Sequence, residues 1–135
     1  MPSDLGFEAT LPLAFDAAIE RVTEALKAEG FGVLTRIDVH DTLKKKIGAE
    51  FRPYAILGAC NPQLAYKALS ARADVGLMLP CNVTVEAAGE GTSLVRIADP
   101  GMMMSVGDLG EAEALRQVGG EARERLQRVA AALSL

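Results

Sequence analysis

The chain has 135 residues and a formal net charge of -4, and 50% of its residues are hydrophobic. This composition is typical of one compact domain over residues 1–135, and it excludes a disordered chain. The acidity argues against binding to nucleic acid or to an anionic membrane surface, because both are negatively charged. No apolar run approaches the roughly 20 residues of a membrane span, and the N-terminus does not resemble a signal peptide. We therefore expect a cytoplasmic protein.

The first part of the chain predicts a strand, a helix and a second strand. Apolar and polar residues alternate over residues 5–11, which is typical of a half-buried strand. Pro12 then opens a stripe of apolar residues at helical spacing, and Gly30 is well placed to end that helix. Alternation returns over residues 31–38, which predicts the second strand.

A short amphipathic helix is predicted after His40. Asp41 is its expected N-cap, because a carboxylate there can accept hydrogen bonds from free backbone N–H groups. We interpret the lysine run 44–46 as a solvated face. Apolar residues repeat every four positions along this stretch: Leu43, Ile47 and Phe51.

The centre of the chain predicts a buried strand followed directly by a helix. The apolar run over residues 54–60 suits an interior strand. Asn61 is a strong N-cap and Pro62 a favoured first helical residue, so a helix is expected to begin here. Alternation over residues 77–86 predicts the next strand, in which Pro80 indicates an edge, a bulge or the start of the strand.

The last part predicts a hairpin and a long helix. Gly89-Glu90-Gly91 is typical of a hairpin turn, and residues 92–98 return as the last strand. From about residue 111 the apolar residues step by three or four, as in a helix that Gly119-Gly120 could break or kink. The whole pattern predicts an α+β two-layer sandwich. Its helices pack on one face of a mainly antiparallel sheet of about five strands.

The two cysteines are the residues most suggestive of chemistry. Cys60 lies where a buried strand meets a helix N-terminus, a place that lowers the pKa of a thiol and favours the thiolate. Alternation places Cys81 on an interior face. The spacing is not that of a CxxC motif, so the two can meet only if strands 54–60 and 77–86 are neighbours. The alternative is that both cysteines are buried packing residues.

Other chemistry has weaker support. His40 is the single histidine, which excludes a multi-histidine metal site within one chain, and it is interpreted as a loop residue. Met102, Met103 and Met104 could offer thioethers to a soft metal, but packing is the favoured interpretation. A hydrolase or transferase using Asp99 with His40 is conceivable, although no spacing requires it.

The segments GACNP (58–62) and GLMLPCNV (76–83), with Ala65, Ala68 and Leu69 between them, resemble the signature of the DUF302 family. The resemblance extends over essentially the whole chain. It implies a small prokaryotic protein with a two-layer α+β fold that forms dimers, and it implies no established reaction. The family's motif positions match five residues of this chain: Cys60, Asn61, Pro62, Pro80 and Cys81.

Two hypotheses follow from these features. The first is a thiol-based site formed by Cys60 and Cys81, serving redox chemistry, sulfur handling or soft-metal binding, with a small thiol, a persulfide or a soft metal ion as its ligand. The second is a non-catalytic homodimeric module that binds a small ligand and uses the cysteines as core packing. Its dimer would bury the apolar strip of the last helix or residues 102–104. Whether the protein is an enzyme stays open at this point, and no cofactor is identified.

Overall fold

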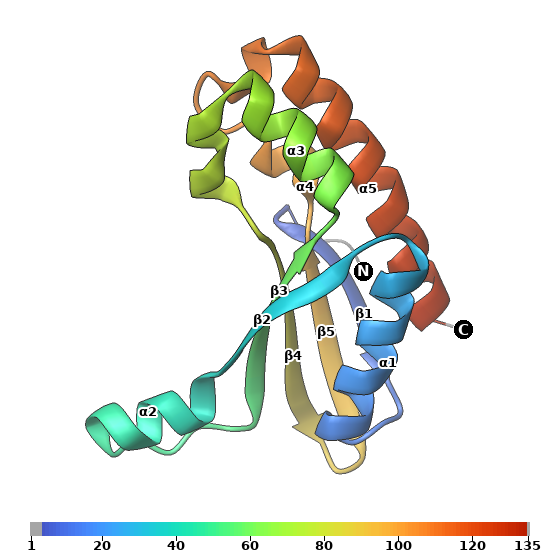
Figure 1. Cartoon of the computed structure of the whole chain (residues 1–135). Coiled ribbons are helices and arrows are strands. Elements are labelled where there is room, and N and C mark those ends of the chain that lie inside the picture. Colours follow the sequence, from blue (N-terminus) through green and yellow to red (C-terminus); the bar gives the residue numbers. More distant parts are fainter. Residues whose placement is uncertain (1–3, 135) are drawn as a thin grey trace.

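The computed structural model describes residues 4–134 and contains one five-stranded sheet (Figure 1). The strand order is β1-β5-β4-β3-β2, and every neighbouring pair is antiparallel. The expected α+β fold with an antiparallel sheet of about five strands is therefore confirmed. The strands are β1 (Gly6–Leu11), β2 (Gly32–Asp38), β3 (Tyr54–Cys60), β4 (Cys81–Gly89) and β5 (Thr92–Ala98).

Three of the longer helices lie to one side of this sheet (Figure 1). Helices α1 (Phe15–Ala28) and α5 (Glu113–Leu133) cover one face, and α3 (Pro62–Ala71) packs on α5 beyond the end of β3. The fourth, α2 (Val39–Ile47), extends away from the other elements. Short helical turns complete the chain: η1 (Ala73–Met78), α4 (Pro100–Met103) and η2 (Leu109–Glu111).

The core lies between the covered face of the sheet and helices α1 and α5. Alternate strand residues point into it, among them Leu57, Val83 and Val95, because successive side chains of a strand face opposite sides. The apolar stripe of α5 is buried against them. The last helix therefore packs within its own chain, and its apolar strip does not offer the dimer surface that the sequence suggested.

Several helix boundaries differ from the sequence-based expectations. Helix α1 begins at Phe15 rather than near Pro12: residues 12 and 13 form a bend, Ala14 is extended, and the Ser93 hydroxyl donates a hydrogen bond to the Leu13 carbonyl. Gly30 follows the helix with φ 84°, as expected for a glycine at a helix end.

The short basic helix also differs in its limits. Helix α2 begins at Val39, so Asp41 lies in its first turn and is not its N-cap. The helix ends at Ile47 because Gly48 adopts a left-handed conformation with φ 67°, which leaves Phe51 outside it. None of the described residues of α2 is buried.

The expected strand over residues 77–86 is shorter at its start. Residues Ala73–Met78 form the 3-10 helix η1, and β4 begins only at Cys81, after the cis peptide bond between Leu79 and Pro80. Pro80 therefore lies just before the strand, which is one of the positions that a proline tolerates. The expected hairpin is confirmed, since β4 ends at Gly89 and β5 begins at Thr92.

A buried carboxylate stabilises the face of the sheet that the helices leave open. Glu86 points to that face, as alternation predicts, yet its side chain is only 7% exposed. Arg52 Nε and Arg96 Nη1 each donate to it at 2.8 Å. Burial alone would raise the pKa of Glu86, but the hydrogen bonds and charges of Arg96 and Arg52 outweigh burial and lower the pKa.

Replacing Glu86 with glutamine is expected to lower the free energy of unfolding by about 2 kcal/mol at neutral pH, because two charge-assisted hydrogen bonds are weakened. A folded-state pKa below the unfolded value stabilises the protein above the unfolded pKa, and this contribution is lost as the pH falls through the folded pKa. The difference between variant and parent should therefore shrink in acid. Urea unfolding at several pH values measures it, with Glu90→Gln in the exposed hairpin turn as control. A difference that stays constant with pH would contradict this role.

Candidate functional site

The sheet brings the two cysteines together at one of its ends. Cys60 is the last residue of β3 and Cys81 is the first residue of β4. The two strands are antiparallel neighbours in which Ala59 pairs with Cys81, so Cys60 is one residue away from the partner of Cys81. The sequence left open whether these two strands are neighbours, and in the structure they are. Both thiols are free and half-buried.

Both cysteines line one small cavity between the end of the sheet and helices α3 and α5. Its free volume is about 30 Å³, which is room for about one or two water-sized groups. Apolar atoms make up nearly all of its exposed lining. Besides the cysteines, its walls include Phe31, Asn61, Leu64, Pro80, Met104 and Ala122.

The residues that follow Cys60 start helix α3, as the sequence predicted. Asn61 is the N-cap, and its Oδ1 accepts a hydrogen bond from the backbone N–H of Leu64 at 3.2 Å. Pro62 occupies the first helical position. Of the three residues expected to flank the cysteines, Asn61 and Pro80 contribute to the described cavity wall, whereas Pro62 is exposed and contributes to the helix only.

The expected activation of Cys60 is not what the surroundings favour. Burial raises the pKa of the Cys60 thiol above its ordinary value. Burial, together with the nearby Cys60, raises the pKa of Cys81 to about 11. Burial is the main cause of both shifts, and a raised pKa keeps both sulfurs mainly as protonated thiols at neutral pH.

Gly58 shapes the same region from the open face of the sheet. An added Cβ there would overlap Thr35 Oγ1 of β2 and lie 2.8 Å from Cγ of Pro80. A residue without a side chain is therefore needed for Pro80 to lie against the strand, and Pro80 immediately precedes Cys81.

The three consecutive methionines separate into two environments. Met104 is only 3% exposed and faces the cavity of the cysteines. Met102 and Met103 are half-buried and line a different hollow. Gly119 explains this placement, because an added Cβ would lie 3.1 Å from Cβ of Met104, so the glycine lets this segment pack closely on α5. The glycine pair does not break α5, which runs unbroken through both residues.

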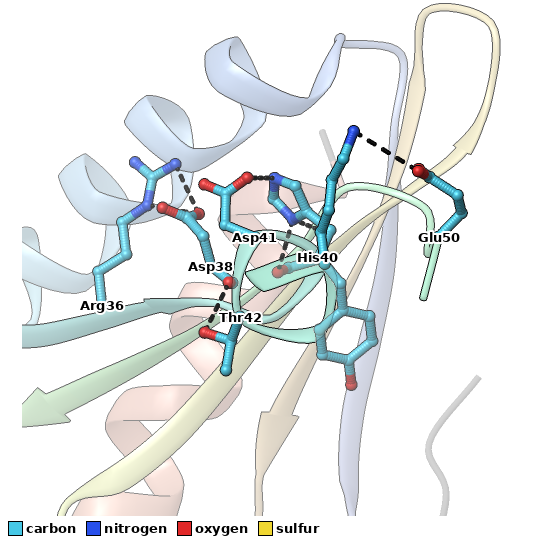
Figure 2. Close-up of polar contacts among 8 residues, drawn as sticks. Arg36, Asp38, His40, Asp41, Thr42 and Glu50 are labelled. Carbon is cyan, nitrogen blue, oxygen red and sulfur yellow. Dashed lines mark hydrogen bonds and ion pairs between the residues drawn. The ribbon is translucent and has the colours of Figure 1, made fainter. Parts of the chain in front are cut away.

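His40 belongs to a different part of the molecule. It lies in α2, and its Nδ1 accepts a hydrogen bond from the backbone N–H of Tyr54 at 3.0 Å. Figure 2 shows His40 beside Asp41, close to the ion pair of Arg36 and Asp38. Tyr54 is at the opposite end of β3 from Cys60, about 20 Å away for a strand of seven residues. His40 therefore joins α2 to the sheet and cannot serve as a base for Cys60.

Asp99 also has a structural role. Its Oδ1 caps the backbone N–H of Gly101 at 2.8 Å, and its Oδ2 accepts from Arg123 Nε at 3.1 Å. It follows β5 at the end of the sheet opposite His40, so the two do not form a joint site.

Sequence patterns had not identified most of the cavity wall. Phe31 precedes β2, Leu64 belongs to α3 and Ala122 to α5, and each follows an ordinary apolar pattern. In the sequence, Met104 differs in no way from the two methionines before it. Among residues 4–134, no three side chains of histidine, cysteine, aspartate or glutamate form a metal-binding group. No helix of the described chain is long and apolar enough to cross a membrane.

The fold and the site define a small α+β protein with a helix-covered antiparallel sheet and two thiols at one end of it. The family model for a domain of unknown function, DUF302, matches residues 7–133, and the chain belongs to this family. The chain is similar to the crystal structure of an uncharacterized conserved protein DUF302 from Bacillus stearothermophilus. The TM-score is 0.83 at 29% identity, with 97% of this chain and 99% of that chain covered. No functionally curated protein matches the chain.

Proposed function

We propose that Cys60 and Cys81 act together as a thiol-based site for redox chemistry, sulfur handling or soft-metal binding. The observation that carries the proposal is that both thiols line one cavity of about 30 Å³. The rest of the wall is almost entirely apolar and contains no other thiol, so the two cysteines are its only groups able to form a disulfide among the described residues. Asn61 supports the site by fixing the start of α3 next to Cys60.

The size of the cavity limits what this site can accept. Only one or two water-sized groups fit in the cavity, so a small thiol or a persulfide would insert its terminal sulfur and keep the rest outside. Protonated thiols in apolar surroundings react slowly with thiol reagents in general. Such a site would therefore react mainly with a specific partner. A cytoplasmic location would keep both thiols reduced between reactions.

Mild oxidation with diamide tests whether the two thiols act as a pair. Diamide takes two electrons and two protons from the thiols, becomes a hydrazine, and leaves an S–S bond. We expect an intramolecular disulfide between Cys60 and Cys81 in peptides mapped by mass spectrometry. Cys60→Ser and Cys81→Ser are the matched controls, because each leaves one thiol. Oxidation that yields only disulfides between chains, or none, would contradict the proposal.

The second candidate function is a non-catalytic dimeric module that binds a small ligand, and a specific hollow favours it. The open face of the sheet carries a hollow of about 480 Å³, which is large enough for a small molecule. Arg96 and Tyr54 offer polar groups within largely apolar walls. Its remaining walls include Leu5, Asn82, Thr84, Met102 and Met103. Residues 102 and 103 thus contribute to this surface, whereas Met104 does not.

Native mass spectrometry of the purified protein distinguishes this second function. A ligand-binding dimer would retain an added small-molecule mass, and Thr84→Trp would remove it by filling the hollow while Cys60→Ser and Cys81→Ser would keep it. A monomer without added mass would contradict the module, as would loss of the mass in either cysteine variant.

A further inference from the structure

A third side chain that carries sulfur lines the cavity at the two cysteines. The Met104 side chain lines the same cavity as Cys60 and Cys81, although it comes from the segment after β5 and not from either cysteine strand. Three separate segments therefore contribute sulfur-containing side chains to the wall of a space of about 30 Å³.

The chemistry of this donor set is selective. Thiolates and thioethers are soft ligands that favour Cu(I), whereas zinc sites use four ligands drawn from cysteine, histidine and carboxylates. Within the described part of the chain no group of three such zinc-type ligands occurs. Two thiols and one thioether match a low-coordinate soft ion and do not match zinc, calcium or magnesium.

We propose that Cys60, Cys81 and Met104 form a three-sulfur site for a single soft monovalent metal ion, Cu(I). This inference rests on the proposed thiol site and narrows its ligand. Binding replaces the proton of each thiol by the metal, so two S–H bonds break, two metal–thiolate bonds form, two protons leave to solvent and Met104 adds a neutral donor. No electron is transferred.

The surroundings fit the product of that reaction. The space accommodates an ion but not a hydrated one, so the sulfurs would replace its water. One monovalent cation with two thiolates carries a single negative charge. The N-terminal end of α3, which begins directly after Asn61, is the positive end of a ten-residue helix and stabilises such a charge. The apolar wall limits access of water to the metal.

The test is a Cu(I) titration of the full-length reduced protein against a competing chelator, under nitrogen. We expect one Cu(I) per chain, and X-ray absorption should show three sulfur neighbours. Met104→Leu removes the thioether at nearly constant volume and should weaken Cu(I) binding by about tenfold or more, leaving two sulfur neighbours. Met78→Leu is the matched control, because Met78 of η1 lines neither the cavity of the cysteines nor the hollow on the open face, and it should bind as the parent does.

Cys60→Ser and Cys81→Ser should each lower the affinity further, by about 100-fold or more. Three results would overturn the inference: no retained Cu(I) in the parent, equal affinity in both methionine variants, or one ion shared between two chains. Diamide oxidation separates these failures from failure of the thiol site itself. A disulfide between Cys60 and Cys81 in a protein that does not bind Cu(I) would retain the proposed function and reject the metal.

Discussion

Replacing Gly58 with alanine is expected to lower the free energy of unfolding by about 1–3 kcal/mol, which is the usual cost of forcing extra volume into a tightly packed place. The new Cβ would overlap Thr35 Oγ1 and lie 2.8 Å from Cγ of Pro80. Neither neighbour can move freely, because Thr35 belongs to β2 and Pro80 leads directly into β4. The change should be measured as a lower urea midpoint in equilibrium unfolding.

The same variant should also affect the thiols. Displacing Pro80 moves the start of β4, where Cys81 lies, so Cys81 should react faster with iodoacetamide than it does in the parent. Gly32→Ala is the matched control, since Gly32 pairs with Cys60 in β2 and an added Cβ there meets no atom of the described structure within 4 Å. Equal midpoints and equal alkylation rates for both variants would show that the contact at Gly58 is loose.

Cys81 is expected to react with iodoacetamide about 100-fold more slowly at neutral pH than an exposed cysteine does, because the thiolate is the nucleophile. Burial and the neighbouring Cys60 raise the pKa of Cys81 to about 11. Below that value the thiolate fraction, and with it the rate, should rise about tenfold for each unit of pH. Cys60 should also react more slowly than an exposed thiol, since burial raises its pKa.

Alkylation followed by peptide mapping measures the two rates separately. The urea-unfolded protein is the control, and there both thiols should react at similar, higher rates. In Cys60→Ser the pKa of Cys81 should fall slightly, because one of its two causes is removed while burial stays. A rate for Cys60 that reaches its plateau near neutral pH would instead revive activation by the end of α3.

Local patterns in the sequence were sufficient to predict most of the fold. Alternation, an apolar run, turn residues and helical spacing identified the five strands and the four longer helices, and Asn61-Pro62 marked the start of α3 correctly. The errors lie where a contact distant in sequence decides the structure. The Ser93 hydroxyl holds the Leu13 carbonyl in the bend before α1. Pro80 packs closely against Gly58, and β4 begins only after it.

The site was predictable only in part for the same reason. Adjacency of Cys60 and Cys81 depends on strand order, which no single segment specifies. The raised pKa of both thiols depends on walls supplied by distant elements, such as Phe31 and Ala122. Glu86 lies on the outer face of the sheet, and its burial there depends on Arg52 and Arg96, which approach it from different segments.

The irregular register of β2 affects how the molecule can associate. An edge strand exposes backbone groups that can pair with another chain and start aggregation. In β2 the pairing with β3 shifts between Val33 and Thr35, and beyond this bulge Arg36 and Asp38 form an ion pair. Bulges and charged side chains are common protections of such edges. This edge is therefore poorly suited to continue the sheet into a neighbouring molecule, even though Leu34 and Ile37 are exposed along it.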